Sequence, residues 1–169
     1  MSSIMRIVFV AALLAVAAKS VNAETPPTTV PTRYFIVKLW VTDLQRSLDF
    51  YRRLGMKEAQ RAGVGKGSKE AVAVEAILSL SGHDLESEID LVYDKNRKTP
   101  LEHGNAFWTI AFAVPDVKAT VKAIADAGYE VTQQPTDVKR NNLPFATGAT
   151  YAYVKDPDGY LIELLQWNR

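Results

Sequence analysis

The chain of 169 residues contains no cysteine and only two histidines, and its net charge is close to zero. Without cysteine it has neither a disulfide framework nor a lipid-modified N-terminal cysteine. The near balance of 20 basic and 19 acidic residues gives no electrostatic footprint for nucleic acid or for an anionic membrane. Both histidines, His83 and His103, fall in links between predicted strands, so we expect solvated loop residues. A disulfide-free chain must rely on a packed core, and 47% hydrophobic residues suit a single globular domain.

No long hydrophobic run is present near the N-terminus. The apolar run from Ile7 to Ala18 has 12 residues, whereas a membrane-spanning helix needs about 20. It is followed by Val21-Asn22-Ala23, small residues of the kind that signal peptidase reads. We therefore predict a cleaved signal peptide at 1–23, a flexible lead-in at 24–32, and export to the periplasm or the exterior with no remaining membrane anchor. A buried N-terminal helix is the alternative.

Two stretches of the chain repeat one plan at an offset of 73 residues. The first set of matches is Val41, Asp43 and Gly55 with Val114, Asp116 and Gly128. The second is the apolar helix positions Leu44, Leu48 and Tyr51 with Val117, Val121 and Ile124, and the third is Ile89-Asp90-Leu91 with Ile162-Glu163-Leu164. A constant offset without gaps indicates a duplicated unit, and it places Asp90 and Glu163 at equivalent strand positions.

Each half is predicted to contain a strand, a helix and three further strands. Alternating or apolar segments predict strands at 33–41, 57–64, 69–80, 88–93, 107–114, 130–138, 149–155 and 161–167. Helices are expected from a cap at Thr42 or Asp43 to Leu54, and from Asp116 to Ala127, each ended by a glycine. In the first strand, odd positions are apolar and face a core, while Tyr34, Ile36, Lys38 and Trp40 form a mixed face suited to a cleft.

Two segments carry a resemblance to a known family: Val41-Thr-Asp-Leu-Gln-Arg-Ser-Leu-Asp-Phe-Tyr51 with Leu54-Gly55, and Asp156-Pro-Asp-Gly-Tyr-Leu-Ile-Glu-Leu164. The chain resembles the vicinal oxygen chelate (VOC) superfamily of glyoxalases, extradiol dioxygenases, and bleomycin- and fosfomycin-resistance proteins. The resemblance implies an α+β fold of two βαβββ modules, whose curved mixed sheets surround a concave site with helices on their outer faces. It places module one at 33–94, a link at 95–105 and module two at 106–167, within one domain at 33–169. Pairing of modules between subunits would make a homodimer.

In metal-dependent members the ligands come from the first and last strands of each module. The resemblance carries these places onto Ile36, Asp90, Thr109 and Glu163. The glyoxalase pattern needs histidine, glutamine or glutamate at the two first-strand places, and isoleucine and threonine cannot replace them in a zinc or nickel site. We therefore expect no cofactor and no tightly bound transition metal, with at most a weakly held divalent cation at Asp90 and Glu163.

Two carboxylates facing a cleft need a partner, because burying unpaired charge is costly. Lys38 lies on the same face, two residues beyond Ile36. Our hypothesis is that its ammonium takes the place of the missing cation between Asp90 and Glu163, and that Lys38 and Glu163 are the catalytic candidates. The alternative is that this triad only keeps the cleft soluble and in register.

Aromatic residues flank the expected cleft and favour a planar or apolar ligand body. The candidate ligand-binding set is Tyr34, Lys38, Trp40, Asp90, Phe107, Thr109 and Glu163, with Trp108 and Trp167 as further aromatic candidates. Each aromatic side chain could instead fill the core or a dimer interface.

The sequence thus predicts an exported VOC protein that binds a small organic molecule between its modules, as in the bleomycin-resistance branch. The alternative is a metal-dependent lyase or isomerase of the glyoxalase (lactoylglutathione lyase) type. Two of the four expected ligand places lack a suitable donor, which weakens that alternative. Export would also separate the protein from the cytosolic thiol that glyoxalases use.

Overall fold

The computed structural model describes residues 36–64, 72–83, 87–97, 99, 101–139 and 148–167. The predicted signal peptide, the lead-in and Tyr34 lie outside these ranges, so their boundaries and roles stay predictions. None of the helices within these ranges is long and apolar enough to cross a membrane.

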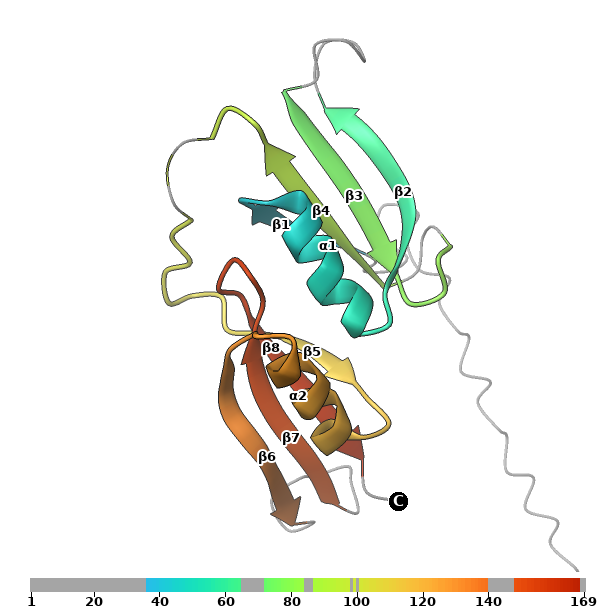
Figure 1. Ribbon diagram of the computed structural model, residues 1–169, viewed down its shortest axis with the longest axis vertical. Helices are drawn as coiled ribbons and strands as arrows, with labels where there is room; N and C mark the ends of the chain where they lie inside the picture. Colours follow the sequence, from blue (N-terminus) through green and yellow to red (C-terminus); the bar gives the residue numbers. More distant parts are fainter. Residues whose placement is uncertain are drawn as a thin grey trace, which may run out of the picture. The chain divides into compact units, whose positions relative to one another are not determined.

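The first module contains β1 (Ile36–Val41), α1 (Leu44–Arg53), β2 (Lys57–Val64), β3 (Ala73–Ser79) and β4 (Glu88–Asp94). Its sheet has the strand order β1-β4-β3-β2 (Figure 1). β1 pairs with β4 in parallel, and the other neighbours are antiparallel.

The second module contains β5 (Ile110–Ala113), α2 (Val117–Asp126), β6 (Val131–Lys139), β7 (Gly148–Lys155) and β8 (Leu161–Trp167). Its sheet order, β5-β8-β7-β6, matches that of the first module. The two four-stranded mixed sheets, each with one helix, confirm the predicted α+β fold of two βαβββ modules.

The strand predicted at 107–114 is shorter in the structure, because β5 begins at Ile110. Its partner strand β8 begins only at Leu161, and the parallel register starts at Ile110↔Ile162. No segment of β8 therefore lies opposite Phe107 and Trp108, which stay outside the sheet with exposed fractions of 46% and 71%.

The 73-residue offset is also present in the strand pairing. Val37 is opposite Ile89 in the first sheet, and the residues 73 positions later, Ile110 and Ile162, are opposite each other in the second sheet. Both helices are capped by aspartate: Asp43 accepts from the Arg46 amide at 3.0 Å, and Asp116 accepts from the Ala119 amide at 2.9 Å. The glycines that follow the helices adopt φ values of +87° at Gly55 and +84° at Gly128, which glycine tolerates without a Cβ clash.

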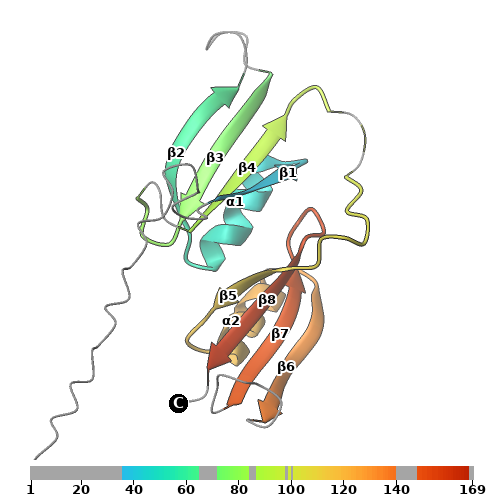
Figure 2. The ribbon, with the colours of Figure 1, turned by 180° about the vertical axis from the view of Figure 1, so that it is seen from behind.

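Each helix covers one face of its own sheet, and the opposite face of each sheet is free of its helix (Figures 1 and 2). The covered faces supply the core. In β1 the odd positions Leu39 and Val41 are buried, whereas Lys38 and Trp40 are exposed, as the alternation predicts. The largest fully buried side chains include Tyr51, Phe50, Leu48, Leu78, Leu91, Ile124, Ile162 and Leu164.

The turn before β8 binds the beginning of α1. Gly159 N donates to Asp156 O at 3.1 Å, which closes the predicted tight turn. Asp158 in this turn accepts from the Thr42 amide at 3.0 Å and from the Ser47 hydroxyl at 2.8 Å. The two segments that carry the family resemblance are therefore in contact, and their polar residues join the two modules.

Candidate functional site

The helix-free face of the first sheet brings Lys38, Asp90 and Glu75 together. Lys38 in β1 is directly opposite Asp90 in β4, and Glu75 lies in the next strand, β3. Lys38 Nζ is 2.6 Å from Asp90 Oδ2 and 2.8 Å from Glu75 Oε1. We call these three residues the Lys38 cluster.

Burial is very uneven within the Lys38 cluster. The side chain of Asp90 is fully buried, whereas the side chain of Lys38 is 54% exposed. Asp90 Oδ2 lies 2.6 Å from the Lys38 ammonium, and it is held by this ion pair. Asp90 Oδ1 has no hydrogen-bond partner among the described residues. Such an arrangement is unusual for a buried polar group and marks a site that needs an explanation.

The ionisation of the cluster follows from this burial. Desolvation raises the pKa of Asp90 above its ordinary value of 3.8, although the neighbouring Lys38 acts in the opposite direction. The contact with Asp90, and then the hydrogen bond to Glu75, raises the pKa of the Lys38 ammonium above 10.5. Lys38 is therefore a cation at neutral pH and does not act as a base or nucleophile there.

The second module repeats the strand geometry without the lysine. The register pair equivalent to Lys38↔Asp90 is Ala111↔Glu163. Glu163 lies opposite Tyr153 in β7, and burial together with the nearby Glu163 raises the pKa of the Tyr153 phenol. Glu163 thus has a tyrosine as its neighbour.

The hypothesis placed Lys38 between Asp90 and Glu163, but the ion pairs of Lys38 in the structure are with Asp90 and Glu75. Glu75 was missed by sequence reasoning. The signal was available in the strand alternation, because Glu75 and Ile77 share one face of β3 and Ile77 pairs with Asp90. Using it required the register of the β3–β4 hairpin, which the sequence alone does not give.

The other predicted site residues differ in their surroundings. Trp40 is 41% exposed, and the Arg97 guanidinium carbon lies 4.5 Å from the centroid of its ring. The Thr109 hydroxyl donates to the Leu161 carbonyl at 3.0 Å. Phe107 is exposed and packs edge-to-face on Tyr160 with ring centroids 6.4 Å apart.

The expectation that both histidines are solvated is wrong for His103. Its Nε2 atom lies 2.7 Å from the Asp158 carbonyl oxygen, and its ring packs edge-to-face on Tyr160 at 4.3 Å. The turn at Asp156–Gly159 folds back onto the link that holds His103, which no local sequence pattern indicates. His83 is exposed, as predicted.

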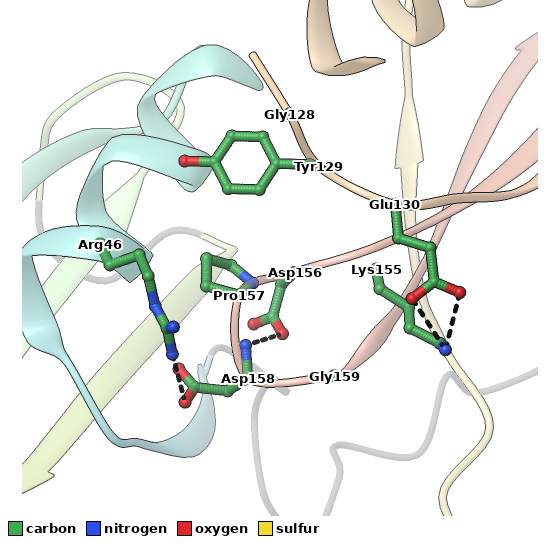
Figure 3. Close-up of a pocket in the computed structure, with 9 residues that line it drawn as sticks. All are labelled: Arg46, Gly128, Tyr129, Glu130, Lys155, Asp156, Pro157, Asp158 and Gly159. Carbon is green, nitrogen blue, oxygen red and sulfur yellow. Dashed lines mark hydrogen bonds and ion pairs between the residues drawn. The ribbon is translucent and has the colours of Figure 1, made fainter.

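A pocket of about 550 Å³ lies beside this turn. Its lining residues are Arg46, Gly128, Tyr129, Glu130, Lys155, Asp156, Pro157, Asp158 and Gly159 (Figure 3). Its charged side chains pair with one another: Arg46 lies 3.4 Å from Asp158, and Lys155 lies 2.9 Å from Glu130. The first ion pair joins α1 to the turn, and the second joins the end of β7 to the segment before β6, so these four charges are already paired within the protein.

A second pocket of about 360 Å³ is mostly apolar. It is lined by Val37, Met56, Leu80, Ser87, Glu88, Ile89, Ile110, Ala111, Phe112 and Ala113. Neither pocket contains any residue of the predicted ligand-binding set. The enclosed pocket that the sequence predicted around that set is therefore not one of these two cavities.

The chain is similar to named enzymes over most of its length. It is 38% identical to a probable lactoylglutathione lyase of Vibrio parahaemolyticus over 132 residues, which are 76% of this chain and 86% of the relative. It is 37% identical to a probable lactoylglutathione lyase of Vibrio cholerae, with the same coverage. Among solved structures, glyoxalase I of Zea mays superposes with a TM-score of 0.66 at 25% identity, covering 81% of this chain. This chain spans only 45% of the maize protein.

These relatives correct one expectation. The sequence led us to expect no cofactor, yet relatives of this similarity carry the name of lactoylglutathione lyase, a metal-dependent class of the family. The expectation that the chain has no cofactor is therefore wrong, because its relatives are named as members of a metal-dependent class.

The side chains at the four family positions do not fit the usual ligand set, however. Ile36 has no donor atom, the Thr109 hydroxyl is bonded to a backbone carbonyl, and an ammonium lies against Asp90. Within the described ranges, no group of three or more His, Asp or Glu side chains is placed to hold a metal ion. The chain is thus similar to lyases that use a metal, but it has different side chains at the places where those lyases have their metal ligands.

The family itself is established by sequence and fold together. The two βαβββ modules have the topology of the solved relatives, and the capping aspartates and the tight turn occupy the positions that the resemblance assigns. The sequence model that describes the Glyoxalase/Bleomycin resistance protein/Dioxygenase superfamily matches residues 33–164. The chain therefore belongs to this superfamily.

Proposed function

We propose that the chain binds a small organic molecule on the helix-free face of its first module, with Lys38 as the polar anchor. The observation that carries this proposal is the uneven burial of the Lys38 cluster. Asp90 and Glu75 hold the ammonium in place, while 54% of the Lys38 side chain remains open to solvent. An ammonium has three donors, so two carboxylate contacts leave one for a ligand oxygen.

The charges of the Lys38 cluster also indicate which kind of ligand oxygen Lys38 would bind. Two carboxylates neighbour one ammonium, so the negative charge is in excess and a further carboxylate would be repelled. A neutral carbonyl oxygen accepts the same hydrogen bond without this repulsion. Trp40 lies two residues along the same face, half-exposed, with Arg97 over its ring, and offers a surface for a planar ligand body. Tyr34 remains a proposed lining residue of this face, and Phe107, Thr109 and Glu163 remain proposed lining residues contributed by the second module.

Thermal-shift and calorimetric titration test the proposal with neutral aromatic ketones, aldehydes and amides, each paired with its carboxylate counterpart. A saturable stabilisation by a carbonyl compound, lost in Lys38→Ala, is expected. Lys155→Ala is the matched control, because Lys155 also forms an exposed ion pair, with Glu130. Ligand binding that survives Lys38→Ala as well as Lys155→Ala would refute the role of Lys38.

A glyoxalase-like lyase or isomerase is the second candidate, and it is favoured by the names of the relatives at 37–38% identity. In this case Glu163 would be the candidate acid–base group, and Lys38 would bind a substrate oxygen. The test is a glyoxalase assay of chelator-treated protein with and without added Ni²⁺ or Zn²⁺. Turnover that depends on the metal and falls in Glu163→Gln supports the lyase, whereas ligand binding without turnover supports the binding protein.

We also propose that the chain is exported after cleavage behind Ala23 and that it forms a homodimer. The support for export is the apolar run followed by small residues at 21–23. The support for a dimer is that β1 and β5 lie at the edges of their sheets, where a second chain could pair. Intact mass of the protein purified from its native cells tests cleavage, and light scattering after size exclusion tests the dimer.

A further inference from the structure

The guanidinium group of Arg97 has no counter-ion in the part of the chain that the structure describes. Within that part it forms no ion pair, and none of its nitrogen atoms has a hydrogen-bond partner. The guanidinium of Arg46, by contrast, lies 3.4 Å from Asp158. Arg97 Nε is buried, whereas the two terminal Nη groups keep contact with solvent. A partly buried cation with free donors is unusual and indicates a place where a ligand can bind.

Arg97 is held in position although it follows a strand. Its amide donates to the Asp94 carbonyl at 3.1 Å, and the Asn96 amide donates to Asp94 Oδ1 at 2.8 Å, so the turn after β4 is closed twice. The guanidinium carbon lies 4.5 Å from the centroid of the Trp40 ring. Stacking on an aromatic face leaves the N–H groups at the edge of the guanidinium plane free, because they point outward within that plane. The donors are therefore oriented before a ligand arrives.

The surroundings of Arg97 are aromatic. The Tyr160 hydroxyl donates to the Trp40 carbonyl at 3.2 Å. Burial raises the pKa of Tyr160, and the positive charge of Arg97 acts on it in the opposite direction. The guanidinium thus lies close to two aromatic side chains, one from each module, and these favour a ligand with a planar body.

The charges near Arg97 indicate which anion is favoured. The planar fork of arginine matches both carboxylates and phosphates, to which it can donate two parallel hydrogen bonds. Asp94 in the same turn and the carboxylates of the Lys38 cluster add negative charge nearby. A phosphate monoester carries close to two negative charges at neutral pH and is repelled more strongly than a carboxylate, which carries one.

Arg97 and Lys38 are close enough to bind two groups of one small molecule. Trp40, under Arg97, is two residues from Lys38 on the same face of β1, which is about 7 Å along a strand. We infer that Arg97 binds the carboxylate of a planar oxo acid whose carbonyl oxygen is bound by Lys38. The carbonyl end of this inference rests on the function proposed above, whereas the carboxylate end rests on Arg97 alone.

Three probes test the two ends separately by calorimetric titration of the full chain: para-acetylbenzoate, acetophenone and benzoate. We expect para-acetylbenzoate to bind about tenfold more tightly than acetophenone, which corresponds to about 1.4 kcal/mol. Arg97→Gln should remove this gain. Arg53→Gln, which removes an equal charge from the last turn of α1, is the matched control and should keep it.

Failure of this inference differs from failure of the proposed function. Benzoate binding that depends on Arg97, without any binding of acetophenone, would reject the role of Lys38 and support the carboxylate site. Equal affinities for para-acetylbenzoate and acetophenone, or a gain that persists in Arg97→Gln, would overturn the inference. Tighter binding of phenyl phosphate than of benzoate would overturn the assignment to carboxylates.

A second measurement uses the unaltered chain. In an NMR titration with benzoate, the backbone amide of Arg97 and the indole N–H of Trp40 should shift saturably, and benzamide should leave both in place. Shifts centred on another part of the chain, or none at millimolar benzoate, would overturn the carboxylate site even if Arg97→Gln failed to fold.

Discussion

The hydroxyl of Tyr51 donates a 2.9 Å hydrogen bond to Asp156 Oδ2, which links the first helix to the turn before the last strand. Both residues are buried. The other oxygen of Asp156 accepts from the amides of Asp158 and Tyr160, each at 2.9 Å. Burial raises the pKa of Asp156 and raises that of the Tyr51 phenol well above its usual value, so Tyr51 is a fixed donor over the physiological range.

Tyr51→Phe should therefore destabilise the fold by about 2 kcal/mol, because it leaves a buried carboxylate oxygen without its donor. Urea unfolding followed by fluorescence measures the change. Tyr129→Phe is the control, since the Tyr129 ring also packs on Phe50 and Tyr129 lines the pocket beside the turn (Figure 3). Equal losses in the two variants would show that the Tyr51 hydroxyl has no special role.

Lys38→Met should raise the pKa of Asp90 further. In the wild type, desolvation raises this pKa and the ion pair with Lys38 opposes it, so removal of the ammonium leaves desolvation unopposed. Titration of the aspartate side-chain carboxyl resonance by NMR measures the change, with Lys155→Met as the control for net charge. An Asp90 titration that is the same in wild type and Lys38→Met would contradict the pairing.

Asp90→Asn should change how stability depends on pH. A carboxyl whose pKa is raised by folding binds its proton more tightly in the native state, so it stabilises the fold at low pH. Stability is then lost as the pH rises from the ordinary value of 3.8 through the raised pKa. Asparagine has no such titration, so the stability of Asp90→Asn relative to wild type should increase with pH across this window. Unfolding curves between pH 3 and pH 8 test the sign, and a constant difference would count against the raised pKa.

Gly159→Ala and Gly55→Ala should destabilise the fold by similar amounts. Both glycines have positive φ, +94° and +87°, so alanine is strained by about 1 kcal/mol at either position. A Cβ at Gly159 would lie 3.4 Å from His103 Nε2, an ordinary van der Waals distance, and a Cβ at Gly55 would meet no atom within 4 Å. Thermal unfolding of the two variants makes the comparison. A much larger loss in Gly159→Ala would show that the space between His103 and the turn cannot accept a methyl group.

The sequence by itself determined the elements and their duplication. The periodicity of apolar residues, the capping aspartates Asp43 and Asp116, and the glycines at 55 and 128 act within a few residues of one another. Such local signals predicted both helices and the order of all eight strands. The constant offset also placed Asp90 and Glu163 at equivalent positions, which the two sheet registers confirm.

Only the tertiary structure decided which of these residues meet. The partner of Lys38 depends on the register of the β3–β4 hairpin, which brings Glu75 to the ammonium. The roles of His103 and of Tyr51 depend on a turn more than 50 residues away in the chain. Contacts of this kind arise from the way whole sheets and helices pack, and a single sequence carries no local signal for them.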